Sequence, residues 1–399
     1  MTVYKVVLNG SGLLEMKVTA ESGDNHLIYL LPIVTGYTLT EISSGSYFAV
    51  ALDITGRAWG WAVNTYGQLG TNNITCYSSP VSVVGGKNFC HISTGNYHSL
   101  AIESNGQAWA WGENTYGNLG TNNTTSYSSP VSVVGGKTFC KISGGFEYSL
   151  AIDNLGQAWA WGGYNYSGQL GTGNHTDYSS PVSVVGVGII FCQITASQRI
   201  ELPHSLGIDK QTLGGWSWGC NDCGQLGTND TNSYCSPVNI CGKHTFCHIS
   251  AGQYGYSLAI DNLGQAWAWG YNGDGQLGTN NTTSYSSPVS VVGGKTFCYI
   301  SAGGVHSLAI DNLGQAWAWG SNRNGELGVN NTTNYSSPVA VCGNHIFCYI
   351  TAGMGGGGIT YAIDTDGKGW AWGRGDLGIL GNNTCNVAVC TPVAICPPY

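Results

Sequence analysis

The chain has 399 residues, of which only 9% are charged, and it carries 62 glycines and a formal net charge of -8. It is too long for one ordinary hydrophobic core, so we expect several domains or a repeat architecture. The sequence contains no basic run with which to neutralise phosphates, which argues against nucleic acid as a partner.

Residues 1–31 are predicted to form a separate N-terminal extension. Two alternating apolar and polar runs flank Asn9-Gly10-Ser11-Gly12 and predict a β-hairpin. Its role is open between a flap that stabilises the first repeat and an element for docking or oligomerisation. The apolar stretch at residues 27–34 is too short to cross a membrane and contains Pro32, so we expect no membrane insertion. The start of the chain also lacks the apolar segment of a secretory signal.

Tryptophan pairs of the form Trp-x-Trp divide the rest of the chain at regular intervals. The pairs use all 14 tryptophans, and their first members are 50, 50, 57, 51, 50 and 53 residues apart. A fixed period near fifty residues indicates tandem repeats. The pairs are Trp59 with Trp61, Trp109 with Trp111, Trp159 with Trp161, Trp216 with Trp218, Trp267 with Trp269, Trp317 with Trp319 and Trp370 with Trp372.

Residues 130–180 show what one repeat contains. Pro130 is expected to occupy the first position of a short apolar strand, because proline suits that position. Residues 139–143, 149–153 and 157–162 predict three more strands, separated by turns that contain glycine or asparagine. Each repeat thus supplies about four short antiparallel strands, which cannot bury their own faces, so neighbouring repeats must pack on one another.

Four-stranded units arranged radially form a propeller. We therefore predict an all-β fold: a seven-bladed β-propeller of four-stranded antiparallel blades over residues 32–399, with an extra N-terminal β-hairpin over residues 1–31. The strand that contains proline and valine occurs an eighth time at residues 32–35. Either this copy or residues 392–396 should complete the blade at which the ring closes, and the sequence leaves both open.

The repeats resemble the regulator-of-chromosome-condensation repeat family. The resemblance rests on Trp-x-Trp, on Gly-x-Leu-Gly in every repeat (residues 67–70 through 378–381) and on the Ser-Pro-Val strand, and it covers about residues 32–399. It implies a seven-bladed propeller that serves as an interaction platform. The family also implies a second function, guanine-nucleotide exchange on a small GTPase.

Three recurrent residue types are predicted to be structural. The tryptophans should pack between blades, because both members of a pair share one strand face. The interchange of His98, His204 and His306 with Tyr148, Tyr256 and Tyr361 favours a structural hydrogen bond over a general base. A cysteine after phenylalanine is predicted to be a small apolar core residue, at Cys90, Cys140, Cys192, Cys247, Cys298 and Cys348.

The cysteines outside this pattern are candidates for cross-links. Cys220 and Cys223 form a Cys-x-x-Cys doublet, which is compatible with a disulfide, with free thiols or with zinc, although no well-spaced second doublet follows. Cys241 with Cys247, and Cys342 with Cys348, flank the same turn in two repeats and could each bridge a hairpin. No metal site is predicted.

Asn-x-Thr occurs once per repeat and has two interpretations. As a glycan acceptor it would place a ring of sugars on the protein, whereas asparagine and threonine are also ordinary turn residues. The turn interpretation is favoured, and the positions, which we expect to match between repeats, are Asn73, Asn123, Asn174, Asn229, Asn281, Asn331 and Asn382.

The positions that differ between repeats are the candidates for specific binding. In the fourth repeat a longer loop contains Gln198, Arg199, Ile200 and Glu201, and loops on a rigid scaffold often carry recognition. A second variable set precedes each Gly-x-Leu-Gly and is rich in residue types that anchor interfaces. It comprises Tyr66, Tyr116, Tyr164, Tyr166, Asn221, Asp222, Tyr271, Arg323 and Arg374, of which the tyrosines and arginines are the predicted binding residues.

These features predict a non-catalytic propeller that binds a protein partner or assembles with itself. No Ser-His-Asp order, carboxylate pair or phosphate-binding loop emerges, so we expect no enzyme activity and no cofactor. The low charge and the loops rich in Gly, Ser, Thr and Asn favour a protein displayed on a surface, extracellular or on a virion, over a cytoplasmic one. The alternatives are an exchange factor for a small GTPase and a lectin-like glycan binder.

Overall fold

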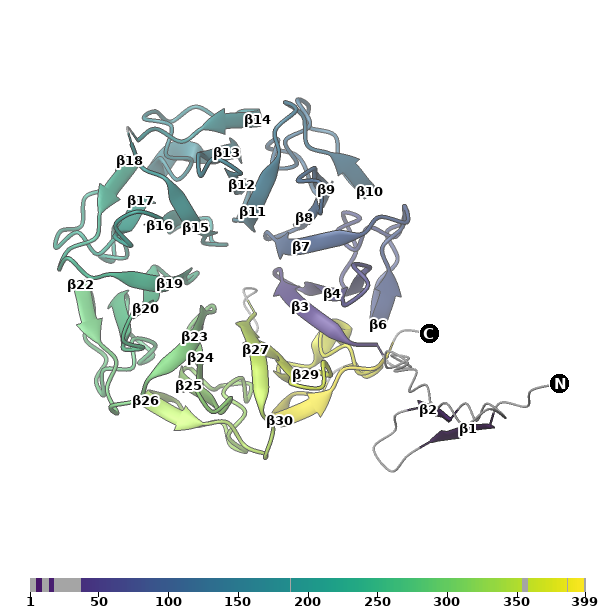
Figure 1. Ribbon diagram of the computed structural model, residues 1–399. Helices are drawn as coiled ribbons and strands as arrows, with labels where there is room; N and C mark the ends of the chain where they lie inside the picture. Colours follow the sequence, from purple (N-terminus) through teal and green to yellow (C-terminus); the bar gives the residue numbers. More distant parts are fainter. Residues whose placement is uncertain are drawn as a thin grey trace, which may run out of the picture.

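The structure is a computed structural model that describes residues 5–8, 14–17, 37–186, 188–353, 358–385 and 387–397. Seven four-stranded antiparallel sheets stand around a central axis as the blades of a propeller (Figure 1). The described residues contain no α-helix, and their helical turns are η1 (Asn165–Ser167) and η2 (Asp376–Gly378). No helix in this part of the chain is long and apolar enough to cross a membrane. The all-β, seven-bladed prediction is confirmed.

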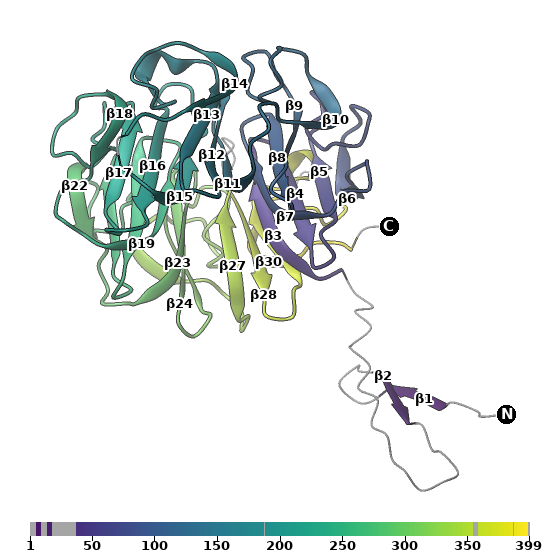
Figure 2. The same cartoon turned by 45° about the horizontal axis from the view of Figure 1, so that its top comes forward.

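Each blade is built from four consecutive strands, which run from the axis outward (Figures 1 and 2). The innermost strands are β3 (Leu39–Ser44), β7 (Phe89–Thr94), β11 (Phe139–Gly144), β15 (Phe191–Ala196), β19 (Phe246–Ala251), β23 (Phe297–Ala302) and β27 (Phe347–Ala352). The second strands are β4 (Phe48–Asp53), β8 (His98–Glu103), β12 (Tyr148–Asp153), β16 (His204–Asp209), β20 (Tyr256–Asp261), β24 (His306–Asp311) and β28 (Ile359–Asp364).

The tryptophan pairs lie on the third strands, which are β5 (Ala58–Ala62), β9 (Ala108–Gly112), β13 (Ala158–Gly162), β17 (Gly215–Gly219), β21 (Ala266–Gly270), β25 (Ala316–Gly320) and β29 (Gly369–Gly373). The outermost strands are β6 (Tyr77–Ser82), β10 (Tyr127–Ser132), β14 (Tyr178–Ser183), β18 (Tyr234–Asn239), β22 (Tyr285–Ser290), β26 (Tyr335–Ala340) and β30 (Val389–Ala394). Pro130 is the fourth residue of β10, not the first as predicted. Proline is tolerated there because β10 is an edge strand.

The N-terminal strands β1 (Lys5–Leu8) and β2 (Leu14–Lys17) pair antiparallel, with Lys5 opposite Lys17 and Leu8 opposite Leu14. The turn predicted between them lies outside the described residues. So does the boundary predicted between residues 31 and 32, and the docking role of residues 1–31 stays a prediction.

The second tryptophan of each pair joins two blades, as expected of a residue that packs between them. All seven side chains are fully buried, and they are Trp61, Trp111, Trp161, Trp218, Trp269, Trp319 and Trp372. The indole Nε1 of each donates to the backbone oxygen of the variable residue in the preceding blade's Gly-x-Leu-Gly, at 2.8–2.9 Å. The motif ends in glycine because a Cβ at Gly70 would lie 2.9 Å from Nε1 of Trp111. Each junction between blades, which we call a seam, therefore has the same bond.

The first tryptophan of each pair is less buried, so the predicted core position has to be corrected for this half of the set. Trp59 is 9% exposed, and the other six are half-buried: Trp109, Trp159, Trp216, Trp267, Trp317 and Trp370. Nε1 of Trp59 donates to Asp53 at 3.0 Å, while the guanidinium of Arg57 lies 5.4 Å from its ring. A lysine lies over the first tryptophan in four other blades, although only Lys368 occupies the sequence position of Arg57. A cation over the ring and a nearby carboxylate therefore recur together around the first tryptophan of the pair.

In the described part of the chain, the blade at which the ring closes takes its strands from the C-terminal end alone. The four strands of the last blade, β27 to β30, all lie between residues 347 and 394, so the C-terminal copy completes this blade. Residues 32–35, the competing copy, lie outside the described residues. The closing seam has the bonds of the other seams: Leu39 N to Gly367 O at 2.7 Å and Trp61 Nε1 to Ile379 O at 2.9 Å.

Candidate functional site

The predicted binding residues converge on one end of the propeller. Within each blade, the loop between the first and second strands and the loop between the third and fourth strands emerge at the same end, because the strands alternate in direction. We call this end the loop face. Residues 198–201 belong to the first kind of loop in blade four, and the seven predicted tyrosines and arginines belong to the second kind.

Blades one to three present an aromatic half of the loop face. Tyr66 packs against Tyr97 with ring centroids 5.4 Å apart. Tyr116 and Tyr164 lie 4.4 Å apart, and their hydroxyl oxygens are 2.9 Å apart. Tyr166 packs edge-on against Tyr164. The sequence analysis did not select Tyr97, although its position, directly before the second strand, also varies between blades.

A carboxyl pair lies beneath the aromatic half, and no sequence motif indicates it. Glu113 and Glu147 come from different blades, are 6% and 5% exposed, and hydrogen-bond to each other. Burial, together with the bond and the charge of Glu113, holds the pKa of Glu147 far above its usual range. Burial also acts to raise the pKa of Glu113, but hydrogen bonds from Glu147 and Thr115 outweigh it and lower that pKa. These opposite pKa shifts favour a single proton shared by the pair and held by Glu147.

The long loop of blade four crosses toward other blades. Gln198 is only 5% exposed, and its Nε2 donates to Thr94 O of blade two at 2.5 Å. The backbone oxygen of Ile200 accepts a bond from Tyr166. Arg199 is paired with Glu201 at 2.7 Å and stacks 3.7 Å from the ring of Tyr254. Arg199 and Glu201 remain accessible, whereas Gln198 holds the loop in place.

The other two predicted arginines are also paired with carboxylates. Arg323 bonds to Asp274 at 3.1 Å, with side-chain exposures of 75% and 16%. Arg374 is paired with Asp376, and its guanidinium lies 5.6 Å from the ring of Tyr47. The arginines of the loop face therefore add no net positive charge to it.

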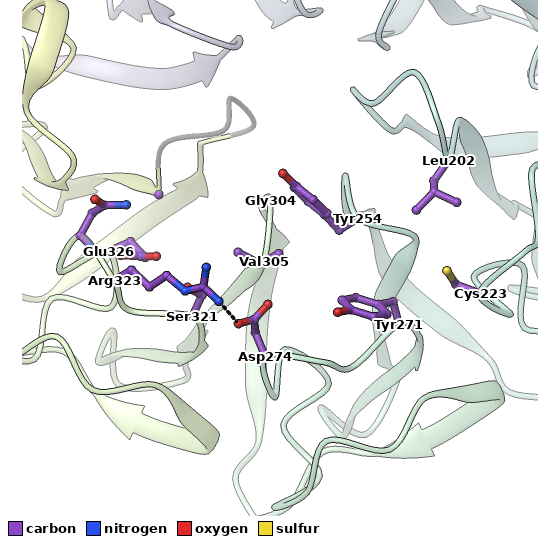
Figure 3. Close-up of a pocket in the computed structure, with 12 residues that line it drawn as sticks. Leu202, Cys223, Tyr254, Tyr271, Asp274, Gly304, Val305, Ser321, Arg323 and Glu326 are labelled. Atoms are coloured by element: carbon purple, nitrogen blue, oxygen red, sulfur yellow. Dashed lines mark hydrogen bonds and ion pairs between the residues drawn. The ribbon is translucent and has the colours of Figure 1, made fainter.

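Blades four to seven line a pocket of about 340 Å³ in the loop face (Figure 3). Tyr254 and Tyr271 form aromatic walls, and Asp274, Arg323 and Glu326 supply charge. The pocket exists because the first loop of blade six is Gly304-Val305, where blade two has Asn96-Tyr97. Glu326 is 1% exposed, and burial raises its pKa.

The central channel is lined by a further variable set, on the innermost strands, which was not among the predicted binding residues. The third residue of each innermost strand faces a cavity of about 520 Å³. Several of these side chains bond to the innermost strand of the next blade: Glu41 to Ile92 N at 3.0 Å and Tyr349 to Ile42 O at 3.0 Å. The set comprises Glu41, His91, Lys141, Gln193, His248, Tyr299 and Tyr349. Variation at one position of an otherwise repeated strand was the available signal.

The repeated histidines and tyrosines bond across seams. His98, His204 and His306 are fully buried, and each Nε2 lies 3.0–3.2 Å from a serine or threonine hydroxyl of the next blade. Burial lowers the pKa of each to about 4. Tyr361 does not belong to this set, contrary to the prediction. Ile359 pairs with Gly373 in the way that Tyr148 pairs with Gly162, so Ile359 occupies the matching position in the last blade.

The cysteines that follow phenylalanine are exposed, contrary to the prediction of a core position. A β-bulge after the phenylalanine of each innermost strand explains this, for example between Phe139 and Lys141. The extra residue turns Cys140 outward while Phe139 and Ile142 both stay buried.

All fifteen cysteines are free thiols, so none of the candidate bridges among Cys220, Cys223, Cys241, Cys247, Cys342 and Cys348 is formed. Cys220 is buried, and burial raises its pKa to about 11. No group of three His, Cys, Asp or Glu side chains that could hold a metal ion occurs in the described part of the chain.

Five of the seven Asn-x-Thr asparagines form one repeated turn, at residues 73, 123, 174, 281 and 331. In each, Oδ1 accepts the amide of the threonine at 2.9 Å. The predicted match fails in two blades. In blade four Asp230 makes this bond, to Asn232 N at 3.0 Å, so Asn229 is one residue early. In blade seven Asn382 Oδ1 also accepts the amide of its threonine, Thr384, at 3.2 Å. Asn382 nevertheless precedes the matching place, because it is Asn383 N that bonds to Ser78 O, in the way that Asn72 N bonds to Ser128 O.

Comparison with known proteins supports the repeat assignment. The model of the regulator of chromosome condensation (RCC1) repeat matches residues 55–102, 105–152, 216–260, 264–310 and 314–358. A second model of the same repeat matches residues 89–118 and 297–326. The yeast RCC1 (Prp20) structure, solved bound to Kap60, superposes with a TM-score of 0.74 at 17% identity and covers 95% of this chain and 90% of that one.

The chain matches only part of the length of similar curated proteins. The chain is 32% identical over 143 residues to the human X-linked retinitis pigmentosa GTPase regulator, over 35% of this chain and 13% of that protein. It is 27% identical over 132 residues to the ultraviolet-B receptor UVR8 of Arabidopsis thaliana, over 32% of this chain and 29% of the receptor. With more than half of its residues matched by the repeat model, the chain belongs to the regulator of chromosome condensation (RCC1) repeat family.

Proposed function

We propose that this propeller binds a protein partner through its loop face and performs no chemistry of its own. The observation that carries the proposal is the contrast between the seams, which are the same seven times, and the loop face, which differs in every blade. Tyrosine and arginine, which are enriched at binding hot spots, gather on that variable face. Rings in contact, such as those of Tyr116 and Tyr164, also hold each other in place, which reduces the entropy lost on binding.

A paired substitution tests the proposal. Tyr66 and Tyr166 are 45% and 53% exposed, and replacing both with alanine should reduce capture of the native partner by about tenfold or more. The matched control replaces Leu155 and Leu313, which are 85% and 83% exposed on turns at the opposite end of the propeller. Quantitative mass spectrometry of the captured proteins should show a partner kept by the control and lost by the loop-face variant. Equal capture by both variants contradicts the proposal.

Guanine-nucleotide exchange on a small GTPase is the second candidate. It is supported by the similarity to a protein named as a GTPase regulator. Binding that displaces nucleotide would need only surface complementarity, so it is consistent with a non-catalytic face. Release of labelled GDP from a panel of small GTPases, with and without the protein, tests it; an unchanged release rate across the panel argues against it.

Display on an extracellular or virion surface is part of the proposal and rests on composition. Only 9% of the residues are charged, and the repeated Asn-x-Thr turns carry few charges. A lectin-like role of these turns, or glycans carried on them, would be consistent with the same composition. The mass of the native protein or particle, measured by light scattering beside intact mass, distinguishes bare monomer, assembly and glycosylated chain.

A further inference from the structure

The pocket of the loop face contains acidic and aromatic groups but has no basic group of its own at depth. Asp274 and Glu326 line it and are 16% and 1% exposed. Arg323, the basic residue among the lining side chains, is 75% exposed. The cation therefore lies at the mouth of the pocket, whereas the carboxyl groups lie inside (Figure 3).

The bond between Arg323 and Asp274 is of a kind that an incoming group can replace. It joins one guanidinium nitrogen to Oδ1 at 3.1 Å and is open to solvent on the arginine side, and ion pairs of that kind contribute little. Glu326 accepts the amide of Asn324 at 2.7 Å. A buried carboxyl group with no cation beside it favours the entry of one, because the charge is then compensated where water is excluded.

The rest of the molecule shows how this chain accommodates cations. Arg57 lies over the ring of Trp59 and bonds to Asp53 at 3.2 Å. Arg199 lies over the ring of Tyr254 and forms an ion pair with Glu201. An aromatic ring beside a carboxylate is the common arrangement, and Tyr271 beside Asp274 repeats it inside the pocket.

We propose that this pocket receives a basic side chain, arginine or lysine, from the protein partner, with Asp274 and Glu326 as its acceptors and Tyr271 as its aromatic wall. The assignment rests on the proposed function and names the chemistry that the partner presents. The formal net charge of -8 also favours encounter with a basic surface. An acidic side chain that binds Arg323 is the competing outcome, and it predicts the opposite response to substitution.

Two small probes separate these outcomes on the full chain. N-acetyl-arginine methylamide represents the basic side chain and N-acetyl-glutamate methylamide the acidic one, with binding followed by chemical-shift titration. We expect the arginine probe to bind with a dissociation constant on the order of 1 mM. Asp274→Asn should weaken it by about five- to tenfold. Arg323→Gln should strengthen it about threefold, because the competing cation is removed.

The controls keep the test specific. Arg374→Gln removes an arginine paired with a carboxylate on the same face outside the pocket, and it should leave binding of the probe unchanged. The melting temperature of each variant, compared with that of the original protein, excludes unfolding as the cause. Stronger binding of the glutamate probe, weaker arginine binding in Arg323→Gln, or no binding of the arginine probe overturns the assignment. A negative probe result with partner capture still lost in the loop-face variant would overturn the pocket assignment alone.

Discussion

The seams and the loop face are made by the same repeats, yet the seams are uniform and the loop face is not. At each seam an indole donates to a backbone oxygen at 2.8–2.9 Å, and neither partner of that bond depends on which side chain follows the glycine of Gly-x-Leu-Gly. A few residues away, the loop face holds paired tyrosines between blades two and three and a pocket at blade six.

This difference follows from where the packing constraints lie. A fully buried indole touches two blades, so any smaller side chain leaves a cavity in both. A loop residue such as Tyr66 or Val305 borders solvent, so its replacement changes the surface and leaves the ring intact. The fold is therefore held by what repeats, and recognition is expected where the repeats differ.

Removal of a seam indole should have the largest effect. Trp218→Ala deletes a fully buried side chain and its bond to Gln169 O, and it should lower the free energy of unfolding by about 3–5 kcal/mol. Trp216→Ala, the matched control, removes the less buried member of the same pair and should cost about 1–2 kcal/mol. Urea denaturation measures both. Equal losses of unfolding free energy in the two variants would mean that the seam indole contributes no more to stability than its less buried partner.

The buried histidines should make the seams sensitive to acid. Burial lowers the pKa of His98, His204 and His306 to about 4 in the folded state, so below about pH 6.5 the unfolded chain binds protons that the folded one does not. Stability is thus full above pH 6.5 and is lost as the pH falls toward 4, by about 2 kcal/mol per histidine at pH 5. His306→Gln should reduce this dependence in denaturation curves between pH 7 and pH 5, and an unchanged slope would refute the explanation.

The carboxyl pair of the aromatic half should respond in the opposite direction. The folded protein holds the proton of Glu147 above the pH at which the unfolded chain releases it, so the stability contribution is full below about pH 4.5 and declines as the pH rises. Glu147→Gln, which cannot ionise, should raise the free energy of unfolding by about 1–3 kcal/mol at pH 7.5. At pH 4 the variant and the original should agree, and a variant that is less stable at both pH values would argue against the shared proton.

Filling the pocket should have the smallest effect on stability. Val305→Tyr introduces the side chain that blade two carries at this position, Tyr97, and should change the free energy of unfolding by no more than about 0.5 kcal/mol. The same variant should abolish binding of N-acetyl-arginine methylamide. Retained binding would show that the probe binds elsewhere on the protein.

The repeated motifs, such as the tryptophan pairs and Gly-x-Leu-Gly, could be predicted from the sequence because each of them marks a buried contact that every blade needs. The tryptophan spacing predicted seven blades, and the residues that differ between repeats predicted which loops to inspect. The bulge that turns Cys140 outward could not be read, because it changes the strand geometry without a residue that signals it. The misplacement of Tyr361 and Asn229 has another cause: small insertions and substitutions move a residue off its structural position while the local motif survives.

The unequal burial of the two tryptophans in a pair also could not be predicted from the alternation of side chains along a strand. Trp159 and Trp161 share one face of β13, so the period of the strand assigns both to the same environment. They differ because Trp161 is covered by the preceding blade, where it donates to Asn118 O, whereas Trp159 lies toward a turn and donates to Asp153 at 2.9 Å. Where along a strand the neighbouring blade ends is set by the curvature of the ring, which a repeat period does not contain.

The pocket and the carboxyl pair could not be predicted from the sequence, because both depend on which residues of different blades lie next to each other. Glu113 and Glu147 lie 34 positions apart in the sequence and belong to different blades, so only the arrangement of the ring brings them into contact. The pocket is produced by side chains that are absent, Gly304 and Val305 in place of larger ones. A small residue in a loop has no distinctive pattern until its neighbours in space are known.

The last blade takes all four of its strands from one uninterrupted stretch, as the other six do. A propeller that shares a strand between its two ends can gain or lose a blade only if that shared strand survives the change. Here a genetic duplication or deletion of about fifty residues would add or remove a complete blade and leave the junction between the ends as it is. The architecture thus makes the blade itself the unit of inheritance, and the new copy would be free to diverge at its loops while its indole still fits the neighbour.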